Sequence, residues 1–293
     1  MSDELRRAAI ALYDRFTHET LDRRAFIAEL TRLAGSAAAA NALLLSVSAC
    51  SSAPPLAPES ASGLVTGNVE WQTGPGRGMR GYSAAPRRWR SGGPAVIVIH
   101  ENRGLNDHIR DVARRAVLAG YRAVAPDFLS PAGGTPADED RARTMIGALD
   151  LSASVADAVG TAAWLRSRAG GGHRRIGAVG FCWGGAMVNR LAVAAGEALD
   201  AGVPFYGPAP DPAQAALVRA ALLVILAGRD ERVNRTALPW VEALRAAGKQ
   251  VESITYPDVD HAFHNDTSAA RYNQTAARQA WAATLAFFAR HLR

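Results

Sequence analysis

The feature that most constrains the fold is an uninterrupted apolar, largely β-branched run at residues 95–99. Such a run is typical of a strand buried on both faces of a parallel sheet. Similar strand-like segments recur along the chain, and amphipathic segments of helical periodicity separate them. The expected strands are residues 95–100, 122–126, 175–179, 201–206, 221–227 and 251–256, and the expected helices are residues 107–119, 139–149, 152–169, 184–195 and 276–292. This alternation predicts an α/β fold, with one mostly parallel central sheet and helices on both faces.

The beginning of the chain differs from the rest, so we divide the sequence into an N-terminal segment, residues 1–63, and a single α/β domain, residues 64–293. A short amphipathic stretch is followed by Arg23 and Arg24 and then by an alanine- and leucine-rich run. An arginine pair before such a run resembles a twin-arginine export signal, and residues 47–50 resemble a lipobox in which Cys50 carries a lipid. These motifs predict export to the periplasm, with residues 51–63 as a tether.

A second interpretation of the N-terminal segment leaves the protein in the cytoplasm. The arginine pair then lies on a helix, and the apolar run forms a helix that packs on the domain. The stretch ahead of the arginines is long for an export signal, which favours this interpretation. Both interpretations stay open at this point.

Composition and charge exclude some classes of partner. The chain has 293 residues, of which 48% are hydrophobic and 20% charged, as in ordinary soluble proteins. The net charge is +6, but the arginines are scattered along the sequence and no aromatic-basic interleaving is present, so we expect no nucleic-acid partner. Nothing in the sequence implies a stable protein partner.

The two cysteines, Cys50 and Cys182, lie in very different surroundings. Their number alone allows a disulfide, but no spacing indicates one. No CxxC motif or His/Cys cluster predicts a structural metal ion.

Residues 180–185, GFCWGG, follow an expected strand and open an expected helix. They match the nucleophile elbow of α/β-hydrolases, G-x-nucleophile-x-G, with cysteine in place of the usual serine. The nucleophile of an elbow lies on a strained turn, so the residues two positions away must lack bulky side chains. A helix N-terminus beneath it favours the reactive thiolate. The pattern therefore predicts that Cys182 is a nucleophile, and the alternative is a small buried cysteine at a glycine-rich turn.

Asp230 and His261 follow in the chain order nucleophile, acid, histidine that α/β-hydrolases share. Each comes just after an expected strand, Asp230 after residues 221–227 and His261 after residues 251–256. We expect both to face Cys182 at the edge of the sheet where ligands bind. The histidine would take the thiol proton and later protonate the leaving group, and the aspartate would fix the histidine tautomer.

Three other polar residues compete for these roles: Asp258, Asp260 and His264, all close to His261 in the sequence. Asp230 is favoured as the acid because it precedes the histidine by one whole strand-helix-strand unit and so can face it. A surface histidine or aspartate is the usual alternative for any one of them.

Glu101 ends the first strong strand, within the sequence HENRGL at residues 100–105. A carboxylate there would meet the nucleophile from the neighbouring strand. The backbone N–H of Asn102 would pair with that of Trp183 to form an oxyanion hole. A solvated loop glutamate is the alternative, and these residues alone do not decide between the two.

Four segments together resemble the dienelactone hydrolase family: HENRGL at 100–105, GFCWGG at 180–185, GRD at 228–230 and DHAF at 260–263. The similarity runs from about residue 65 to the C-terminus. The resemblance implies an α/β-hydrolase fold in which Cys182, Asp230 and His261 form the triad. It also implies that Glu101 contacts the resting thiol and controls its ionisation. The implied reaction is hydrolysis of a small-molecule ester or lactone through an acyl-thioester, with no metal and no cofactor.

The sequence departs from the family at one position. Members that act on dienelactone carry an arginine four residues after the histidine, where it holds the substrate carboxylate, and here that residue is Asn265. Arg141, Arg143 and Arg229 are candidates to replace it. The departure puts hydrolysis of dienelactone itself in question but not the reaction class.

Three functional hypotheses follow. The first is a cysteine hydrolase of carboxylic esters or lactones. The second is acyl transfer on the same residues to an acceptor other than water. The third is a scaffold that binds a ligand or partner without turnover, against which the complete set of four site residues argues.

Overall fold

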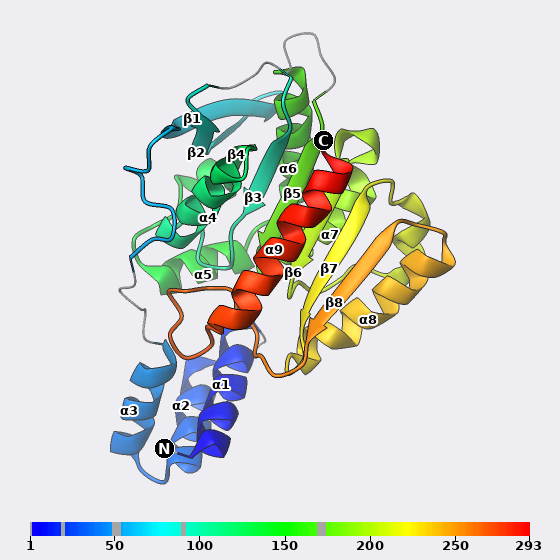
Figure 1. Ribbon diagram of the computed structural model, residues 1–293. Coiled ribbons are helices and arrows are strands. Elements are labelled where there is room, and N and C mark those ends of the chain that lie inside the picture. The colour runs from blue at the N-terminus through cyan, green and yellow to red at the C-terminus, as the bar shows by residue number, and fades with distance from the viewer. Residues whose placement is uncertain (1, 19–20, 49–53, 89–91, 169–173) are drawn as a thin grey trace.

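The computed structural model describes residues 2–18, 21–48, 54–88, 92–168 and 174–293 (Figure 1). In these ranges eight strands form one sheet in the order β1-β2-β4-β3-β5-β6-β7-β8. The strands are β1 (Leu64–Gly74), β2 (Arg77–Pro86), β3 (Ala95–Ile99), β4 (Arg122–Asp127), β5 (Ile176–Phe181), β6 (Ala201–Phe205), β7 (Ala221–Ala227) and β8 (Val251–Tyr256). Strands β3 to β8 pair in parallel, which confirms the predicted mostly parallel sheet.

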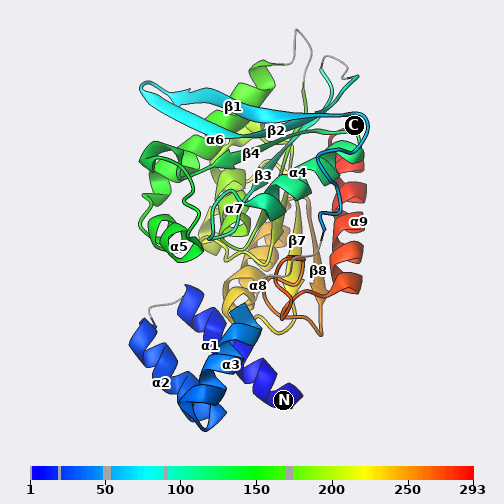
Figure 2. The same cartoon turned by 90° about the vertical axis from the view of Figure 1, so that its left-hand side faces the viewer.

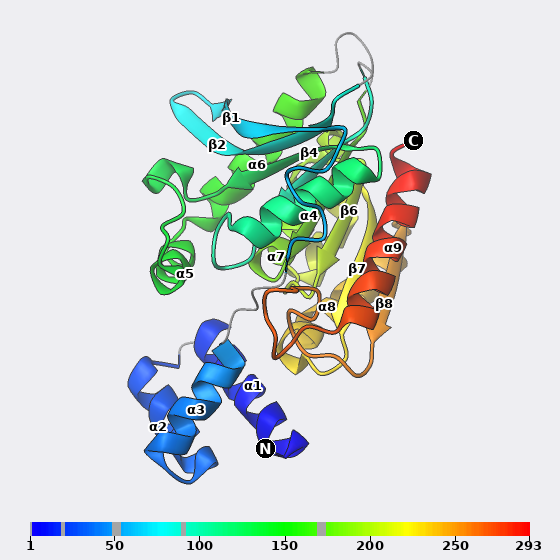
Figure 3. The ribbon, with the colours of Figure 1, turned by 60° about the vertical axis from the view of Figure 1, so that its left-hand side comes forward.

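Helices cover both faces of the sheet, as predicted. Those of the α/β domain are α4 (Asp107–Leu118), α5 (Glu139–Gly147), α6 (Leu151–Ser167), α7 (Trp183–Ala194), α8 (Glu231–Ala246) and α9 (Gln274–His291). Apolar residues of α4 and α9 share one buried cluster, and those of α6, α7 and α8 share another. Figure 3 shows α4 and α9 in front of the sheet and α6 and α7 behind it. The central strands β3, β5 and β7 are buried along their whole length between the two clusters, which is why their sequences are continuously apolar.

The first two strands were not predicted. Strands β1 and β2 form an antiparallel hairpin, and β2 continues antiparallel onto β4, so the sheet is mixed at this edge. Most residues of β1 are exposed or half-buried, because β1 is the edge strand of the sheet. As the edge strand, β1 needs no continuous apolar run, and in β2 glycine and arginine interrupt the buried residues, so neither strand shows the signal that marked the buried strands.

The N-terminal segment forms three helices, α1 (Asp3–His18), α2 (Arg23–Ala34) and α3 (Ala37–Ser48). They share a small core of their own, which includes Ile10, Phe26, Leu30 and Leu43. Figure 2 shows them as a group below one end of the central sheet. Strands β3 and β5 to β8 end at this side, so the N-terminal helices lie over the edge where the predicted site residues gather.

The export motifs fall partly within these helices. The arginine pair opens α2, and Asp22 caps that helix by accepting a hydrogen bond from the backbone N–H of Ala25. Cys50 of the lipobox lies outside the described residues. In the part of the chain that the structure describes, no single helix meets the length and hydropathy required to cross a membrane; α2 and α3 meet them only as a pair bent by 107°.

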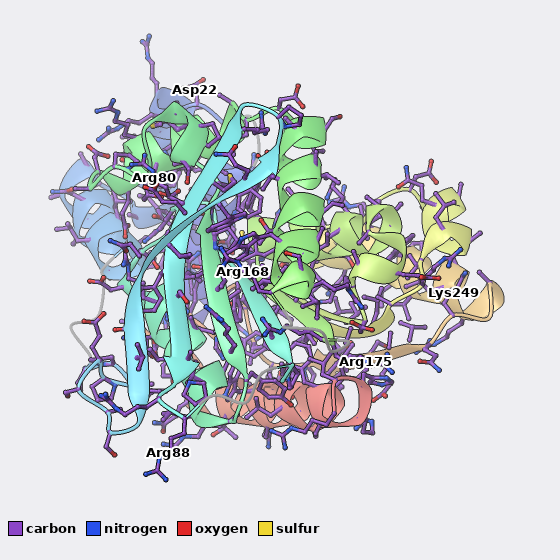
Figure 4. The ribbon with its side chains drawn as sticks, turned by 90° about the horizontal axis from the view of Figure 1, so that it is seen from above. Asp22, Arg80, Arg88, Arg168, Arg175 and Lys249 are labelled. Atoms are coloured by element: carbon purple, nitrogen blue, oxygen red, sulfur yellow. The ribbon has the colours of Figure 1, made fainter. Side chains whose placement is uncertain are left out.

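The positive charge is distributed over the surface. Arg80 on β2, Arg88 after β2 and Lys249 between α8 and β8 lie on separate parts of the molecule (Figure 4). This arrangement agrees with the scatter of arginines along the sequence.

Candidate active site

Cys182 occupies a strained elbow between β5 and α7. Its φ of 57° and ψ of −113° lie in a region that L-residues rarely adopt. A Cβ on Gly180 would lie 2.2 Å from the carbonyl oxygen of Gly184, and a Cβ on Gly184 would lie 2.3 Å from that of Ile99. The glycines on either side are therefore required by contact, as the sequence pattern predicted. The elbow holds the sulfur at the end of the sheet, 4% exposed.

Asp230 and His261 meet across two neighbouring loops. His261 Nδ1 lies 2.5 Å from Asp230 Oδ2, and because the carboxylate only accepts, Nδ1 carries the proton. Asp230 Oδ1 accepts from the backbone N–H of Val233 at 3.1 Å, so the same carboxylate caps the first turn of α8. A Cβ on Gly228 would lie 2.3 Å from the carbonyl oxygen of Pro257. The missing side chain of Gly228 thus lets the two loops approach closely enough for this pair.

The charges around His261 favour its imidazolium form. Burial opposes that charge, but the negative charges of Asp230 and of an ionised Cys182 outweigh burial and raise the pKa of His261 to about 10. Burial also opposes the charge of Asp230, yet its interaction with His261 keeps the pKa of that carboxyl below the usual value. His261 Nε2 is buried and has no hydrogen-bond partner among the described residues, so it is available to a substrate.

The competing candidates lie elsewhere. The side chain of Asp258 is 87% exposed and lies 3.5 Å from Arg229. Asp260 lies 3.9 Å from the same arginine. His264 is buried and stacks on the ring of Phe181, and burial holds its pKa well below the usual range. Asp230 is the carboxylate that the structure brings to His261.

Glu101 is buried beside the elbow and is held by Asn265. Asn265 Nδ2 donates to Glu101 Oε2 at 2.6 Å, while Oε1 is buried and lacks a partner in the described part of the chain. Burial raises the pKa of Tyr206 well above its usual value, and the negative charges of Glu101 and Cys182 raise it further. The carboxylate and the sulfur therefore act on the same enclosed space, although the described hydrogen bonds do not join them.

The two predicted oxyanion donors border one cavity. Trp183 is the first residue of α7, so its backbone N–H belongs to the first-turn donors that have no intrahelical acceptor. Asn102 follows Glu101, and its side-chain Nδ2 donates to the carbonyl of Thr17 at 3.2 Å. Both residues line a cavity with Cys182.

His18, which the sequence interpretation did not include, lies directly at the sulfur. Its Nε2 is 3.1 Å from Cys182 Sγ, and its ring makes an edge contact with that of His261, with centroids 4.7 Å apart. His18 is the last residue of α1 and is 164 positions from Cys182. A histidine in the last turn of a helix carries no local signal of such a contact.

The contacts of α1 with the α/β domain surround this histidine. Arg271 Nη1 donates to Asp14 Oδ1 at 2.9 Å, and Arg103 Nη2 donates to the Tyr13 hydroxyl at 3.1 Å. Both side chains of the Asp14–Arg271 pair are largely buried, so this ion pair is shielded from water. Together with the Asn102–Thr17 bond, these contacts fix the end of α1 over the elbow.

Two cavities meet at Cys182 and His18. The first, of about 300 Å³, lies between the N-terminal helices and the domain, and its walls include Phe26, Leu45 and Glu101. The second, of about 330 Å³, extends along α7 past Met187. Both cavities are lined by Cys182 and His18, so the sulfur lies where they join.

The candidate substrate arginines occupy three different environments. Arg143 lines both cavities, lies 4.6 Å from the centre of the Phe16 ring and pairs with Asp140 at 3.3 Å. Arg229 lines a separate hollow, and Arg141 is exposed. Arg143 is therefore the one of the three that the structure places near the sulfur.

One set of potential metal ligands is present among the described residues. His18, Cys182 and His261 each offer one donor atom, and these atoms all lie within 4.8 Å of one another. A metal ion held there would replace the thiol proton and occupy His261 Nε2, so it would compete with acyl transfer rather than assist it.

Comparison with known proteins identifies the family. The model of the dienelactone hydrolase family matches residues 79–292, which is most of the chain. The chain belongs to the dienelactone hydrolase family. It is thus an ester or lactone hydrolase of that family, with the α/β-hydrolase fold.

Individual relatives support the family assignment. A Salmonella typhi protein with the name of a carboxymethylenebutenolidase is 32% identical over 257 residues, which cover 82% of this chain and 94% of that protein. An Escherichia coli K12 protein of the same name is 34% identical, covering 73% of this chain and 83% of that protein. A solved dienelactone hydrolase structure from Klebsiella pneumoniae has a TM-score of 0.70 at 29% identity and covers 78% of this chain and 99% of that chain.

Proposed function

We propose that this dienelactone hydrolase relative cleaves carboxylic esters or lactones with Cys182 as the nucleophile, through an acyl-thioester intermediate. The observation that carries the proposal is the elbow. It holds a strained, buried cysteine at the end of the sheet, within 4.8 Å of a ring nitrogen of His261, which Asp230 orients. In this arrangement the sulfur is positioned to attack a carbonyl carbon, and the buried imidazole of His261 is close enough to transfer protons.

The reaction begins when the sulfur of Cys182 bonds to the carbonyl carbon of the substrate and the thiol proton passes to an imidazole beside it. Negative charge then develops on the carbonyl oxygen, where the backbone N–H groups of Asn102 and Trp183 would stabilise it. His261, oriented by Asp230, gives a proton to the departing alcohol and recovers one from water in the second half of the cycle. Water attack on the thioester releases the acid and restores Cys182.

The cavities support a substrate with substituents on both sides of the scissile bond. Because the sulfur lies where the two cavities join, the acyl group would occupy one and the alcohol part the other. Each cavity is at the small end of the range for small-molecule sites. We therefore propose small esters or lactones as substrates.

Acyl transfer to another acceptor uses the same residues and differs only in the second half of the cycle. It predicts that an added alcohol or amine raises the rate at which the acyl-enzyme disappears. Hydrolysis predicts that this rate is the same with and without the acceptor.

Turnover of short p-nitrophenyl esters and simple lactones by wild type and Cys182→Ala tests the proposal. Removing the nucleophile should lower kcat by several orders of magnitude, since only oxyanion-hole and binding effects remain. Intact-mass spectrometry of quenched wild type should show an acyl adduct that Cys182→Ala lacks. Half of the wild-type rate in the variant would contradict the assignment.

A further inference from the structure

We propose that His18, delivered by the N-terminal helix α1, is a catalytic residue that takes the proton of the Cys182 thiol. The inference rests on the proposed function and assigns one proton transfer in it. His18 lies before residue 79, where the match to the family model begins. The triad residues are described above, and His18 adds a second imidazole at the same sulfur.

Hydrogen bonding sets the tautomer of His18. Its Nδ1 lies 2.9 Å from the carbonyl oxygen of Asp14, which can only accept, so Nδ1 carries the proton. The Thr17 hydroxyl donates to the carbonyl of Tyr13 at 2.9 Å and is also 2.9 Å from this Nδ1. In the neutral ring, Nε2 therefore presents its lone pair to Cys182 Sγ at 3.1 Å, so the thiol is the donor.

The two histidines are suited to opposite roles. His18 Nδ1 donates to the carbonyl of Asp14 and its Nε2 faces the thiol, so His18 is a neutral acceptor. His261 Nδ1 instead donates to Asp230 Oδ2 at 2.5 Å, and the negative charge of that carboxylate favours the imidazolium form of His261. His18 Nε2 thus lies at the thiol, and His261 Nε2, which has no hydrogen-bond partner among the described residues, is left to serve the leaving group.

Proton transfer between these groups balances over the whole cycle. As the bond between Cys182 sulfur and the acyl carbon forms, the thiol proton moves to His18 Nε2. As the bond to the leaving oxygen breaks, that oxygen takes the proton from His261 Nε2. Water then attacks the thioester and gives its proton to His261, and the departing sulfur recovers the proton held by His18. The net change is ester plus water to acid plus alcohol.

Two contacts between α1 and the α/β domain keep His18 within hydrogen-bond distance of the thiol. The Asp14–Arg271 ion pair and the Asn102–Thr17 hydrogen bond lie within four residues of His18 and join α1 to loops of the site. A general base must lie within hydrogen-bond reach of its proton, and these two contacts maintain that distance. The N-terminal helices are then part of the active site.

Chemical rescue tests the proposal in the full-length chain. We expect His18→Gly to slow the burst of p-nitrophenol that reports acylation by about 10²–10³-fold, the usual contribution of general base catalysis. Added imidazole should restore the burst rate saturably, because it can occupy the vacated space. His291→Ala, at the far end of α9, is the matched control and should keep the wild-type burst with no response to imidazole.

A second variant covers the case in which glycine loosens α1. His18→Gln retains an acceptor for the thiol but cannot take the proton, so it should fold, as judged by circular dichroism, and acylate as slowly as His18→Gly. Wild-type acylation in either variant, or slow acylation of His18→Gly without imidazole rescue, would overturn the role of His18. Activity retained in Cys182→Ala would instead reject the proposed function, so the two failures are distinguishable.

Discussion

The side-chain nitrogen of Asn265 lies 2.6 Å from Oε2 of Glu101, and both residues are buried. Asn265 Oδ1 accepts from the backbone N–H and the hydroxyl of Thr267, at 3.0 and 2.6 Å, which orients its Nδ2 toward the carboxylate. The position at which the sequence departs from the dienelactone-cleaving members therefore holds a catalytic-site carboxylate in place. A residue directed at Glu101 in this way is not directed at a substrate carboxylate.

This pair predicts the response of the thiol to alkylation. Glu101→Gln keeps the hydrogen bond from Asn265 but removes a negative charge near the sulfur, which favours the thiolate. We expect the free variant to react faster with iodoacetamide than wild type, while its ester turnover falls. Mass spectrometry and absorbance measure both rates on one preparation, and equal alkylation of the two proteins would make Glu101 a bystander.

Asn265→Ala should lower kcat/KM by about 10–100-fold, the equivalent of one lost hydrogen bond to a charged group. The double variant Glu101→Gln/Asn265→Ala should lose much less than the product of the two single effects, because the residues act as a unit. Independent, multiplicative losses in steady-state kinetics would show that Asn265 acts elsewhere.

Asp230→Asn should lower kcat by on the order of 10²–10⁴-fold, because His261 loses the acceptor that fixes its tautomer. The matched control is Asp258→Asn, whose side chain is 87% exposed, and it should keep nearly full activity. Asp260→Asn should also cost less than Asp230→Asn. The assignment of the acid is wrong if Asp260→Asn proves the most damaging of the three.

Gly184→Ala should destabilise the fold, since the added Cβ would lie 2.3 Å from the backbone oxygen of Ile99. Overpacking of this kind costs about 1–3 kcal/mol, and backbone atoms have little room to move. Gly147→Ala in α5 has nothing within 4 Å of its Cβ and should be neutral or slightly stabilising. Urea unfolding of both variants checks the difference.

The pH dependence of kcat/KM should be broad. His18 acts when neutral, and its lowered pKa keeps it neutral below pH 6.5, so activity should persist into mild acid. His261 acts when protonated, and the negative charge of Asp230 raises its pKa above the usual imidazole value, so activity should fall only at alkaline pH. The profile is measured as kcat/KM against pH with an ester whose own stability does not change with pH. A fall in kcat/KM on the acidic side at the ordinary pKa of imidazole would contradict the role given to His18.

The N-terminus of the protein in its native cell tests the export motifs. Cleavage at the lipobox would begin the mature chain at Cys50 and remove all three N-terminal helices, including His18. We propose that the enzyme retains these helices, so intact-mass measurement should give a chain that includes α1. A lipid-modified chain starting at Cys50 would support export and exclude His18 from catalysis.

The sequence predicted the elements whose burial can be recognised from the residues of one short segment. The runs of β3, β5 and β7 are apolar because both faces are covered, and the elbow glycines are required by backbone contact. The β1–β2 hairpin was missed because neither strand carries a continuous apolar run, and the contact of His18 with Cys182 was missed because it depends on tertiary packing. The predicted partner of the thiol was Glu101, whereas in the structure the described partner is His18.

Asp230 both orients His261 and caps the first turn of α8. Selection on stability alone would therefore preserve this aspartate in a descendant that no longer hydrolyses anything, because losing the cap costs about 1 kcal/mol. His261 has no comparable structural role, because its Nε2 makes no hydrogen bond to the described residues. When related sequences are searched for members that have become inactive, the histidine is the residue that should disappear first, while the aspartate persists as a relic of the helix.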